Sequence, residues 1–207
     1  MKTLSPNQGP ISRRGLLYAA TTAVAAVGVG AAAWPLIDQM NPDARARAAG
    51  DILDVDIGGL RPGEQIAVQW RKLPVVVTRR TPQMLAAMRE SAFVNALFDA
   101  DSAKRQQPGY AKNWHRSIDP AYAVLVAVCT SCRCVPRYFA ESSTVNVAGG
   151  YVCPCCASHY DPAGRAYAGI ARYNLPVPPY VVAGPTKIVL GKNTADEIYS
   201  LDSVEQI

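Results

Sequence analysis

The most apolar stretch of the chain lies near its start. Residues 16–37 (LLYAATTAVAAVGVGAAAWPLI) contain no charged side chain. A helix needs roughly 20 apolar residues to cross the hydrocarbon core of a membrane. The pattern therefore predicts a transmembrane anchor over residues 16–37, and Trp34 near its end is typical of an aromatic side chain at a membrane interface.

The segments on either side of this stretch predict an export signal and a tether. Arg13 and Arg14, within Ser12-Arg-Arg-Gly-Leu-Leu17, form a twin-arginine export pattern, and their charges favour a cytoplasmic N-terminus over residues 1–15. Ala31-Ala-Ala33 leaves open the alternative of a cleaved signal peptide. Residues 38–50 are polar and small with no apolar face, which predicts a flexible tether.

From residue 51 the pattern changes to short β-prone runs separated by glycine and proline turns. Such runs occur at 53–57, 65–70, 74–78, 121–128, 145–152, 175–183 and 186–190. They predict a mainly β head domain over residues 51–207, built from antiparallel strands. Thr81-Pro82 interrupts the pattern with an N-cap and a proline at the first helical position, which predicts one helix from there to about Phe98.

Charge adds little to this picture. The chain has 21 Lys and Arg residues against 16 Asp and Glu, a net charge of +5. The basic residues are scattered and form no stripe interleaved with aromatic side chains. We therefore expect no nucleic-acid partner.

Cysteine adds most. All six cysteines lie in two clusters, Cys129-Thr-Ser-Cys132-Arg-Cys134 and Cys153-Pro-Cys155-Cys156, each following a predicted strand. Thiolates in two such loops are favoured ligands for iron and zinc, so the clusters predict a metal site. The alternative is three disulfides in an exported domain. The adjacent pair Cys155 and Cys156 argues against it, because neighbouring cysteines do not easily pair with each other.

These features together resemble the Rieske iron-sulfur subunit of ubiquinol-cytochrome c reductase, in its proteobacterial form. The resemblance is carried by the twin-arginine anchor, the segments 34–42, 55–81 and 174–180, and the residues Val135-Pro136 and Ser158-His-Tyr-Asp161 beside the clusters. It implies an antiparallel β-sandwich head with a small cluster-binding subdomain over about 123–175, anchored in the bacterial inner membrane and facing the periplasm. It also implies a [2Fe-2S] cluster that passes electrons from quinol to a c-type cytochrome, in a dimeric complex with cytochrome b.

The resemblance also assigns roles to individual residues. It implies that Cys129 and Cys153 bind iron, that Cys134 and Cys155 form a disulfide, and that the Ser158 and Tyr160 hydroxyls donate hydrogen bonds to sulfur atoms of the cluster and its ligands. The two histidine ligands of the family, however, correspond here to Ser131 and Cys156. The histidines that the chain does have, His115 and His159, are interpreted as surface residues.

A different ligand set is therefore expected. Cys129 and Cys132 with Cys153 and Cys156 give C-x2-C twice, a set suited to an all-cysteine [2Fe-2S] centre, a single tetrahedral iron, or zinc; Ser131 is a weaker candidate. Histidine-ligated clusters have potentials of roughly −150 to +300 mV, against about −400 mV for plant-type all-cysteine clusters. The alternative function is thus a paralogue or variant with zinc, a low-potential centre or no cluster, which does not oxidise quinol.

Overall fold

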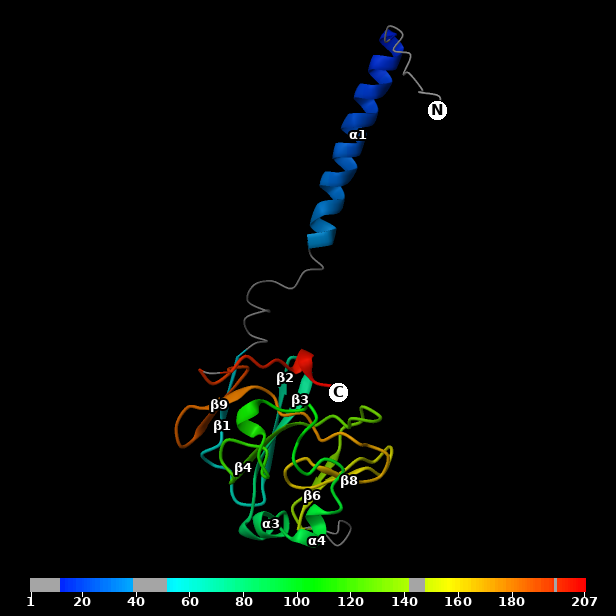
Figure 1. Cartoon of the computed structure of the whole chain (residues 1–207). Coiled ribbons are helices and arrows are strands. Elements are labelled where there is room, and N and C mark those ends of the chain that lie inside the picture. The colour runs from blue at the N-terminus through cyan, green and yellow to red at the C-terminus, as the bar shows by residue number, and fades with distance from the viewer. Residues whose placement is uncertain (1–11, 39–51, 142–147, 196) are drawn as a thin grey trace. The chain divides into compact units, whose positions relative to one another are not determined.

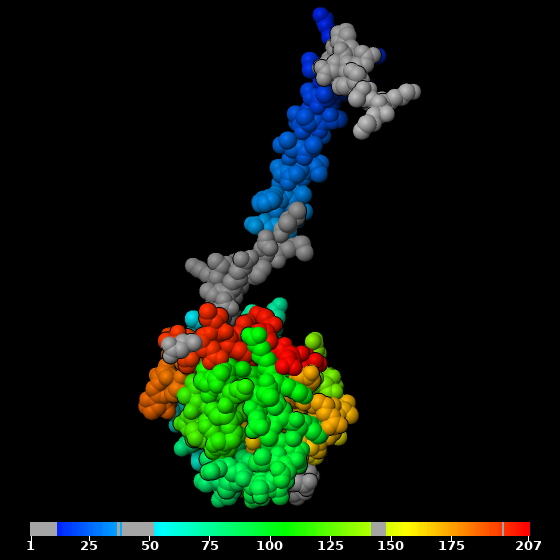
Figure 2. Space-filling model, in the orientation of Figure 1, coloured from blue at the N-terminus to red at the C-terminus, as the bar shows by residue number. Residues whose placement is uncertain are grey.

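The computed structural model describes residues 12–38, 52–141, 148–195 and 197–207, and the chain divides into two units, Met1–Arg47 and Ala48–Ile207. The first unit contains helix α1, Arg13–Asp38 (Figure 1). Ser12 caps it, because the Ser12 Oγ accepts a hydrogen bond from the Gly15 N–H. By length and composition, 13–36 could cross a membrane, and its side chains are exposed (Figure 2). The predicted tether beyond Asp38 lies outside the described residues.

The second unit is mainly β, as predicted, with three antiparallel sheets among its described residues. The first sheet has the order β1 (Leu53–Asp56), β10 (Lys187–Leu190), β9 (Tyr180–Val182). The second has the order β2 (Gln65–Trp70), β3 (Leu73–Arg79), β4 (Tyr122–Val126). Strand β4 is almost fully buried and leads through Ala127 and Val128 to Cys129.

The third sheet lies beside the cysteine clusters. Its order is β5 (Arg137–Phe139), β6 (Gly150–Val152), β7 (His159–Tyr160), β8 (Ala166–Ala168). Strand β5 leaves the first cluster, while β6 enters the second and β7 leaves it. Neither β5 nor β8 was predicted, since both are three-residue strands with no clear alternation. The predicted strand over 145–152 is described only as β6, because 142–147 lie outside the described residues.

The single predicted helix over 82–98 is two short helices, α3 (Pro82–Ala87) and α4 (Ser91–Val94). Thr81 caps α3, as its Oγ1 accepts a hydrogen bond from the Met84 N–H. The helix ends near Met88, whose carbonyl accepts a hydrogen bond from Arg165 Nη2 at 2.9 Å. In a continuing helix this carbonyl would accept from a backbone N–H one turn later. Glu90 is then extended, and α4 begins anew.

Two other segments differ from the sequence pattern. Residues 175–179 form no strand, because Pro176, Pro178 and Pro179 lack the N–H that a ladder requires. The polar segment after Asp99 contains one short 3₁₀ helix, η1 (Gly109–Ala111). A second 3₁₀ helix, η2 (Leu201–Ser203), lies near the C-terminus. This polar segment is partly buried, and Arg116 within it is fully buried.

Candidate metal centre

Four free thiols gather where the second and third sheets meet the two cysteine clusters. The Sγ atoms of Cys129, Cys132, Cys153 and Cys156 all lie within 4.8 Å of one another. The Sγ–Sγ distances are 3.5 Å for Cys129 to Cys156, 3.2 Å for Cys132 to Cys153, and 3.4 Å for Cys132 to Cys156. Cys129 and Cys153 are fully buried, and Cys132 and Cys156 are partly buried. The structure thus brings together all four thiols of the expected ligand set.

The first loop closes on itself through two backbone hydrogen bonds. The Cys129 N–H donates to the Cys134 carbonyl at 2.8 Å, and the Arg133 N–H donates to the Cys129 carbonyl at 2.9 Å. Arg133, the residue after the second thiol, has φ +60°. This is a tight turn with one residue in the left-handed region, and it points the side chains of its first and fourth residues to the same place.

The second loop repeats this geometry. The Cys153 N–H donates to the Ser158 carbonyl at 2.8 Å, the Ala157 N–H donates to the Cys153 carbonyl at 3.0 Å, and Ala157 has φ +49°. Counted from its first cysteine, each hydrogen bond and the left-handed residue fall at the same position as in the first loop. The two C-x2-C segments are therefore structural equivalents, a likeness that the sequence hinted at by spacing alone.

Backbone N–H groups also surround the sulfur atoms. The N–H groups of Cys155 and Cys156 bond to the Cys153 thiol, while those of Cys134 and Ser158 bond to the Cys132 and Cys156 thiols. Such donors stabilise a thiolate over a thiol. The two loops thus supply backbone donors to three of the four thiols.

The thiols do not all ionise by themselves. Burial raises the pKa of Cys132 and raises that of Cys153 to about 12. Burial also opposes ionisation of Cys156, but hydrogen bonds from Ser158 and from the Cys132 and Cys153 thiols outweigh it and lower the Cys156 pKa to about 6. A cation would have to displace the remaining protons, as thiolate-binding metals do.

A disulfide joins the two loops beside the four thiols. It links Cys134 of the first loop to Cys155 of the second, with their Cα atoms 6.4 Å apart. Because each partner lies within two residues of a free thiol, the bond limits how far the loops can move apart. All six cysteines of the two clusters thus take part in the disulfide or in the short contacts between thiols.

Two hydroxyl groups contact the thiols from the strand that leaves the second loop. Tyr160 Oη lies 3.3 Å from Cys129 Sγ, and Ser158 Oγ lies 3.1 Å from Cys156 Sγ. Both side chains are fully buried. Thr130, which sequence reasoning missed, accepts or donates to Tyr160 Oη at 3.2 Å and orients it.

The other candidates lie elsewhere. Ser131 is exposed at the tip of the first loop. His115 Nδ1 lies 2.8 Å from Ser117 Oγ, and His159 Nδ1 lies 3.5 Å from Tyr167 Oη. Neither histidine belongs to a group of metal-ligand atoms among the described residues. The donor set that the structure offers is therefore sulfur alone, which fits iron or zinc and contains no imidazole nitrogen.

A buried charged turn supports the second loop from behind. Directly after Tyr160, Asp161 pairs with Arg165 at 2.7 Å, and both side chains are buried. Arg80 Nε donates to the Pro162 carbonyl and Arg116 Nη1 to the Ala163 carbonyl of the same turn. Sequence reasoning did not identify Arg80 as buried, because composition does not distinguish a buried arginine from an exposed one.

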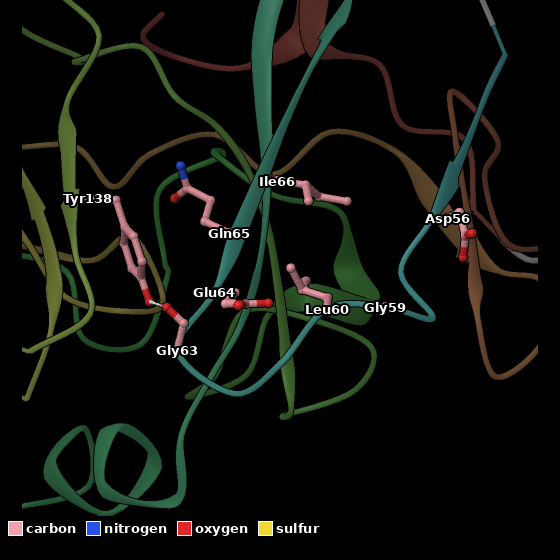
Figure 3. A pocket seen from close by; sticks show the side chains of 8 residues that line it. All are labelled: Asp56, Gly59, Leu60, Gly63, Glu64, Gln65, Ile66 and Tyr138. Carbon is pink, nitrogen blue, oxygen red and sulfur yellow. Dashed lines mark hydrogen bonds between the residues drawn. The ribbon is translucent and has the colours of Figure 1, made fainter.

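A pocket elsewhere in the head holds none of the cysteines. Its lining comes from the end of β1, the following turn, the start of β2 and one residue of β5: Asp56, Gly59, Leu60, Gly63, Glu64, Gln65, Ile66 and Tyr138 (Figure 3). Tyr138 Oη donates to the Gly63 carbonyl at 3.0 Å across it. Glu64 is engaged by Arg61. The pocket shows no convergence of reactive groups, so the cysteine cluster remains the candidate site.

Comparison with known proteins identifies the family of the chain. Residues 4–43 match the family model described as "Ubiquitinol-cytochrome C reductase Fe-S subunit TAT signal". The ubiquinol-cytochrome c reductase iron-sulfur subunit of Allochromatium vinosum is 42% identical over 186 residues, covering 87% of this chain and 89% of the relative. That of Blastochloris viridis is 41% identical over 193 residues, covering 92% and 99%.

A solved structure, "Hyperthermophilic respiratory Complex III", is also similar, with 18% identity and a TM-score of 0.47 over 82% of this chain and 98% of that one. The sequence relatives decide the assignment, because their identity extends over most of both chains. The chain belongs to the family of ubiquinol-cytochrome c reductase iron-sulfur subunits.

Proposed function

We propose that the chain is a membrane-anchored electron-transfer subunit of a quinol-cytochrome c reductase complex, in which Cys129, Cys132, Cys153 and Cys156 bind iron. The observation that carries the proposal is the convergence of these four thiols within 4.8 Å in a chain of this family. Thiolate-bound iron, when present, supplies a reversible one-electron change. The resemblance implies that this iron belongs to a [2Fe-2S] cluster.

The surrounding residues support such a centre. The Cys134–Cys155 disulfide holds the loops together, and the Tyr160 and Ser158 hydroxyls lie against two of the sulfur atoms. Hydrogen bonds to a sulfur ligand stabilise the more negative, reduced state. Cys132 and Cys156 are partly exposed, so one edge of the site is open toward an electron-transfer partner.

The partners follow from the family. The relatives are named for the oxidation of ubiquinol by cytochrome c, so we infer that quinol, cytochrome b and a c-type cytochrome are the partners, in a dimeric complex. The anchor α1 and the twin-arginine match favour the lipid bilayer of the bacterial inner membrane, with the head in the periplasm. Arg13 and Arg14 serve as the export signal in this proposal.

The all-sulfur donor set changes what the centre can do. Without an imidazole ligand, no ring nitrogen of the centre takes a proton from quinol. An added thiolate also lowers the potential relative to a histidine-ligated cluster. A redox titration separates the possible donors: a potential far below that of quinol would exclude quinol as the direct electron donor to this chain.

A second candidate function is favoured by the same four sulfur atoms. A tetrahedral set of four cysteines also suits structural zinc. In that case the chain is a paralogue that assembles with the complex and transfers no electrons. It would then contain zinc, have no visible chromophore, and show no change on reduction.

The test uses the full-length chain, exported, extracted from membranes in detergent and purified. We expect iron and a visible absorption that bleaches with dithionite and returns when an oxidised c-type cytochrome is added. The Cys153→Ser variant is expected to lose both iron and colour, whereas Ser131→Ala, at the exposed tip of the first loop, retains them. A colourless, iron-free protein, or one that cytochrome does not reoxidise, would refute the proposed function.

A further inference from the structure

The spacing of the four thiols bears on how many metal ions they hold. Three of the six sulfur–sulfur distances are 3.2, 3.4 and 3.5 Å, and none of the six exceeds 4.8 Å. Four sulfurs bound tetrahedrally to one ion, at about 2.3 Å each, lie about 3.8 Å apart. The thiols therefore already occupy a volume close to that of one metal–sulfur tetrahedron.

A two-iron centre requires a wider arrangement. In an all-cysteine [2Fe-2S] cluster, two tetrahedra share the edge formed by the two bridging sulfides, and each iron takes two cysteines. With tetrahedral angles and bonds of about 2.3 Å, cysteine sulfurs on different irons lie at least roughly 5.3 Å apart. Four of the six distances would have to exceed this value. All six are shorter here.

We propose that the two loops hold a single metal ion between Cys129, Cys132, Cys153 and Cys156, in a mononuclear tetrahedral centre instead of a [2Fe-2S] cluster. That the ion is iron rests on the proposed function. The single-ion geometry rests on the positions of the sulfur atoms, with support from the backbone of the two loops and from charge.

The backbone of the two loops supports one ion. Both loops have the same pair of closing hydrogen bonds and the same left-handed residue, Arg133 or Ala157, so each presents its two thiols in the same way. Two equivalent pairs facing each other supply the four corners of one tetrahedron. Cys132 is then one of the four ligands. Ser131, which stands at the position of a histidine ligand in the family, is exposed.

The disulfide keeps the two loops, and so the two thiol pairs, facing each other. Cys134 and Cys155 are bonded with Cα atoms 6.4 Å apart, and they lie two residues after Cys132 and two after Cys153.

Charge favours the smaller centre as well. Four thiolates on a ferric ion leave one negative charge, and one-electron reduction leaves two. An all-thiolate [2Fe-2S] centre, with two ferric ions and two sulfides, carries one more negative charge in each state. Because Cys129 and Cys153 are fully buried, every added charge is costly there. Metal binding releases a proton from each thiol that is still protonated.

The test measures iron, zinc and acid-labile sulfide per chain in the full-length protein purified from membranes, with EPR spectra of the oxidised and reduced forms. We expect one metal ion per chain and no sulfide. An isolated ferric ion is paramagnetic when oxidised, whereas a [2Fe-2S] pair is EPR-silent when oxidised and gives a signal when reduced. Two irons and two sulfides per chain would overturn the inference and leave the proposed function standing.

Failure of the proposed function gives a different result from failure of the single-ion inference. One zinc per chain without sulfide would support the single-ion site but refute the proposed electron transfer. A chain with neither metal nor sulfide would refute both. As a matched pair, Cys132→Ala should weaken metal binding by more than about a hundredfold, since even outer partners of metal ligands contribute 10–100-fold, while Ser131→Ala should leave one ion per chain. If Cys132→Ala retains a metal centre and Ser131→Ala loses it, the assignment of Cys132 is wrong.

Discussion

At the scale of single residues, the informative feature is which side chains touch sulfur. The C-x2-C spacing was enough to propose Cys129, Cys132, Cys153 and Cys156 as a set, and the structure brings their Sγ atoms together. It could not be foreseen that Thr130 would orient Tyr160, since a threonine between two cysteines has no distinctive pattern. The buried arginines were also missed, because each binds backbone carbonyls that the sequence does not mark.

Removing the hydroxyl of Tyr160 should lower the reduction potential of the centre. Its Oη lies 3.3 Å from Cys129 Sγ, and its hydrogen bond favours the state in which the sulfur is more negative. For a loss of roughly 1 kcal/mol, Tyr160→Phe should shift the potential down by about 40 mV. Tyr138→Phe is the control, because Tyr138 Oη donates its hydrogen bond to the Gly63 carbonyl and not to a sulfur atom (Figure 3). It should leave the potential unchanged. Equal shifts in both variants would contradict the role of Tyr160.

Removing Asp161 should destabilise the head strongly. Its carboxylate accepts hydrogen bonds from the Ala163 and Arg165 N–H groups and pairs with the Arg165 guanidinium at 2.7 Å, with both side chains buried. Asp161→Ala leaves a buried charge without its partner, which costs about 3–5 kcal/mol in the free energy of unfolding. Denaturant unfolding measures this. The exposed pair of Asp54 and Lys187 is the control: Asp54→Ala should cost less than about 1 kcal/mol.

At the scale of elements, the sequence predicted strands better than their partners or limits. Short β-prone runs between turns identified β2, β3 and β4, and Thr81-Pro82 identified the start of α3. The break after Ala87 was not predictable, because it depends on Arg165, which lies some eighty residues later in the chain. The equivalence of the two cysteine loops was visible as spacing, but the left-handed conformation of Arg133 and Ala157 was not, as neither is glycine.

Strand β6 depends on a glycine at its first residue. Gly150 has φ +136°, and a Cβ there would lie 2.3 Å from the Tyr160 carbonyl oxygen on the neighbouring strand β7. We expect Gly150→Ala to destabilise the head by about 2–4 kcal/mol, from backbone strain and a clash, and to disturb Tyr160. Thermal or denaturant unfolding provides the measurement. Gly59→Ala, where a Cβ would meet no atom within 4 Å, should be close to neutral; if the two variants unfold alike, the close approach of β6 and β7 is wrong.

At the scale of the whole molecule, the chain combines an apolar helix with a β head that carries the cysteines. The helix was predictable from hydropathy because no charge interrupts residues 16–37. The head was predictable as mainly β, but its three sheets were not, since they depend on pairings between strands far apart in sequence, such as β1 with β10. The two units serve the proposed function together: one places the subunit in a membrane, and the other holds the metal.

The export pattern is testable in the whole chain. Replacing Arg13 and Arg14 together by lysine keeps the charge but removes the twin-arginine pair. We expect the head to stay on the cytoplasmic side, where protease added to spheroplasts does not reach it, while the unchanged chain is cleaved. The double change Arg45→Lys and Arg47→Lys conserves charge outside the motif and should not affect export. A head that remains accessible without the pair would show that export uses another route.

The most direct measurement is X-ray absorption at the iron edge of the full-length protein purified from membranes, because it reads the ligands and the metal neighbours of iron together. Our account predicts four sulfur atoms at about 2.3 Å, no nitrogen ligand, and no second iron nearby. Nitrogen ligands would contradict the assignment of the four cysteines. An iron–iron contribution would contradict the single-ion centre.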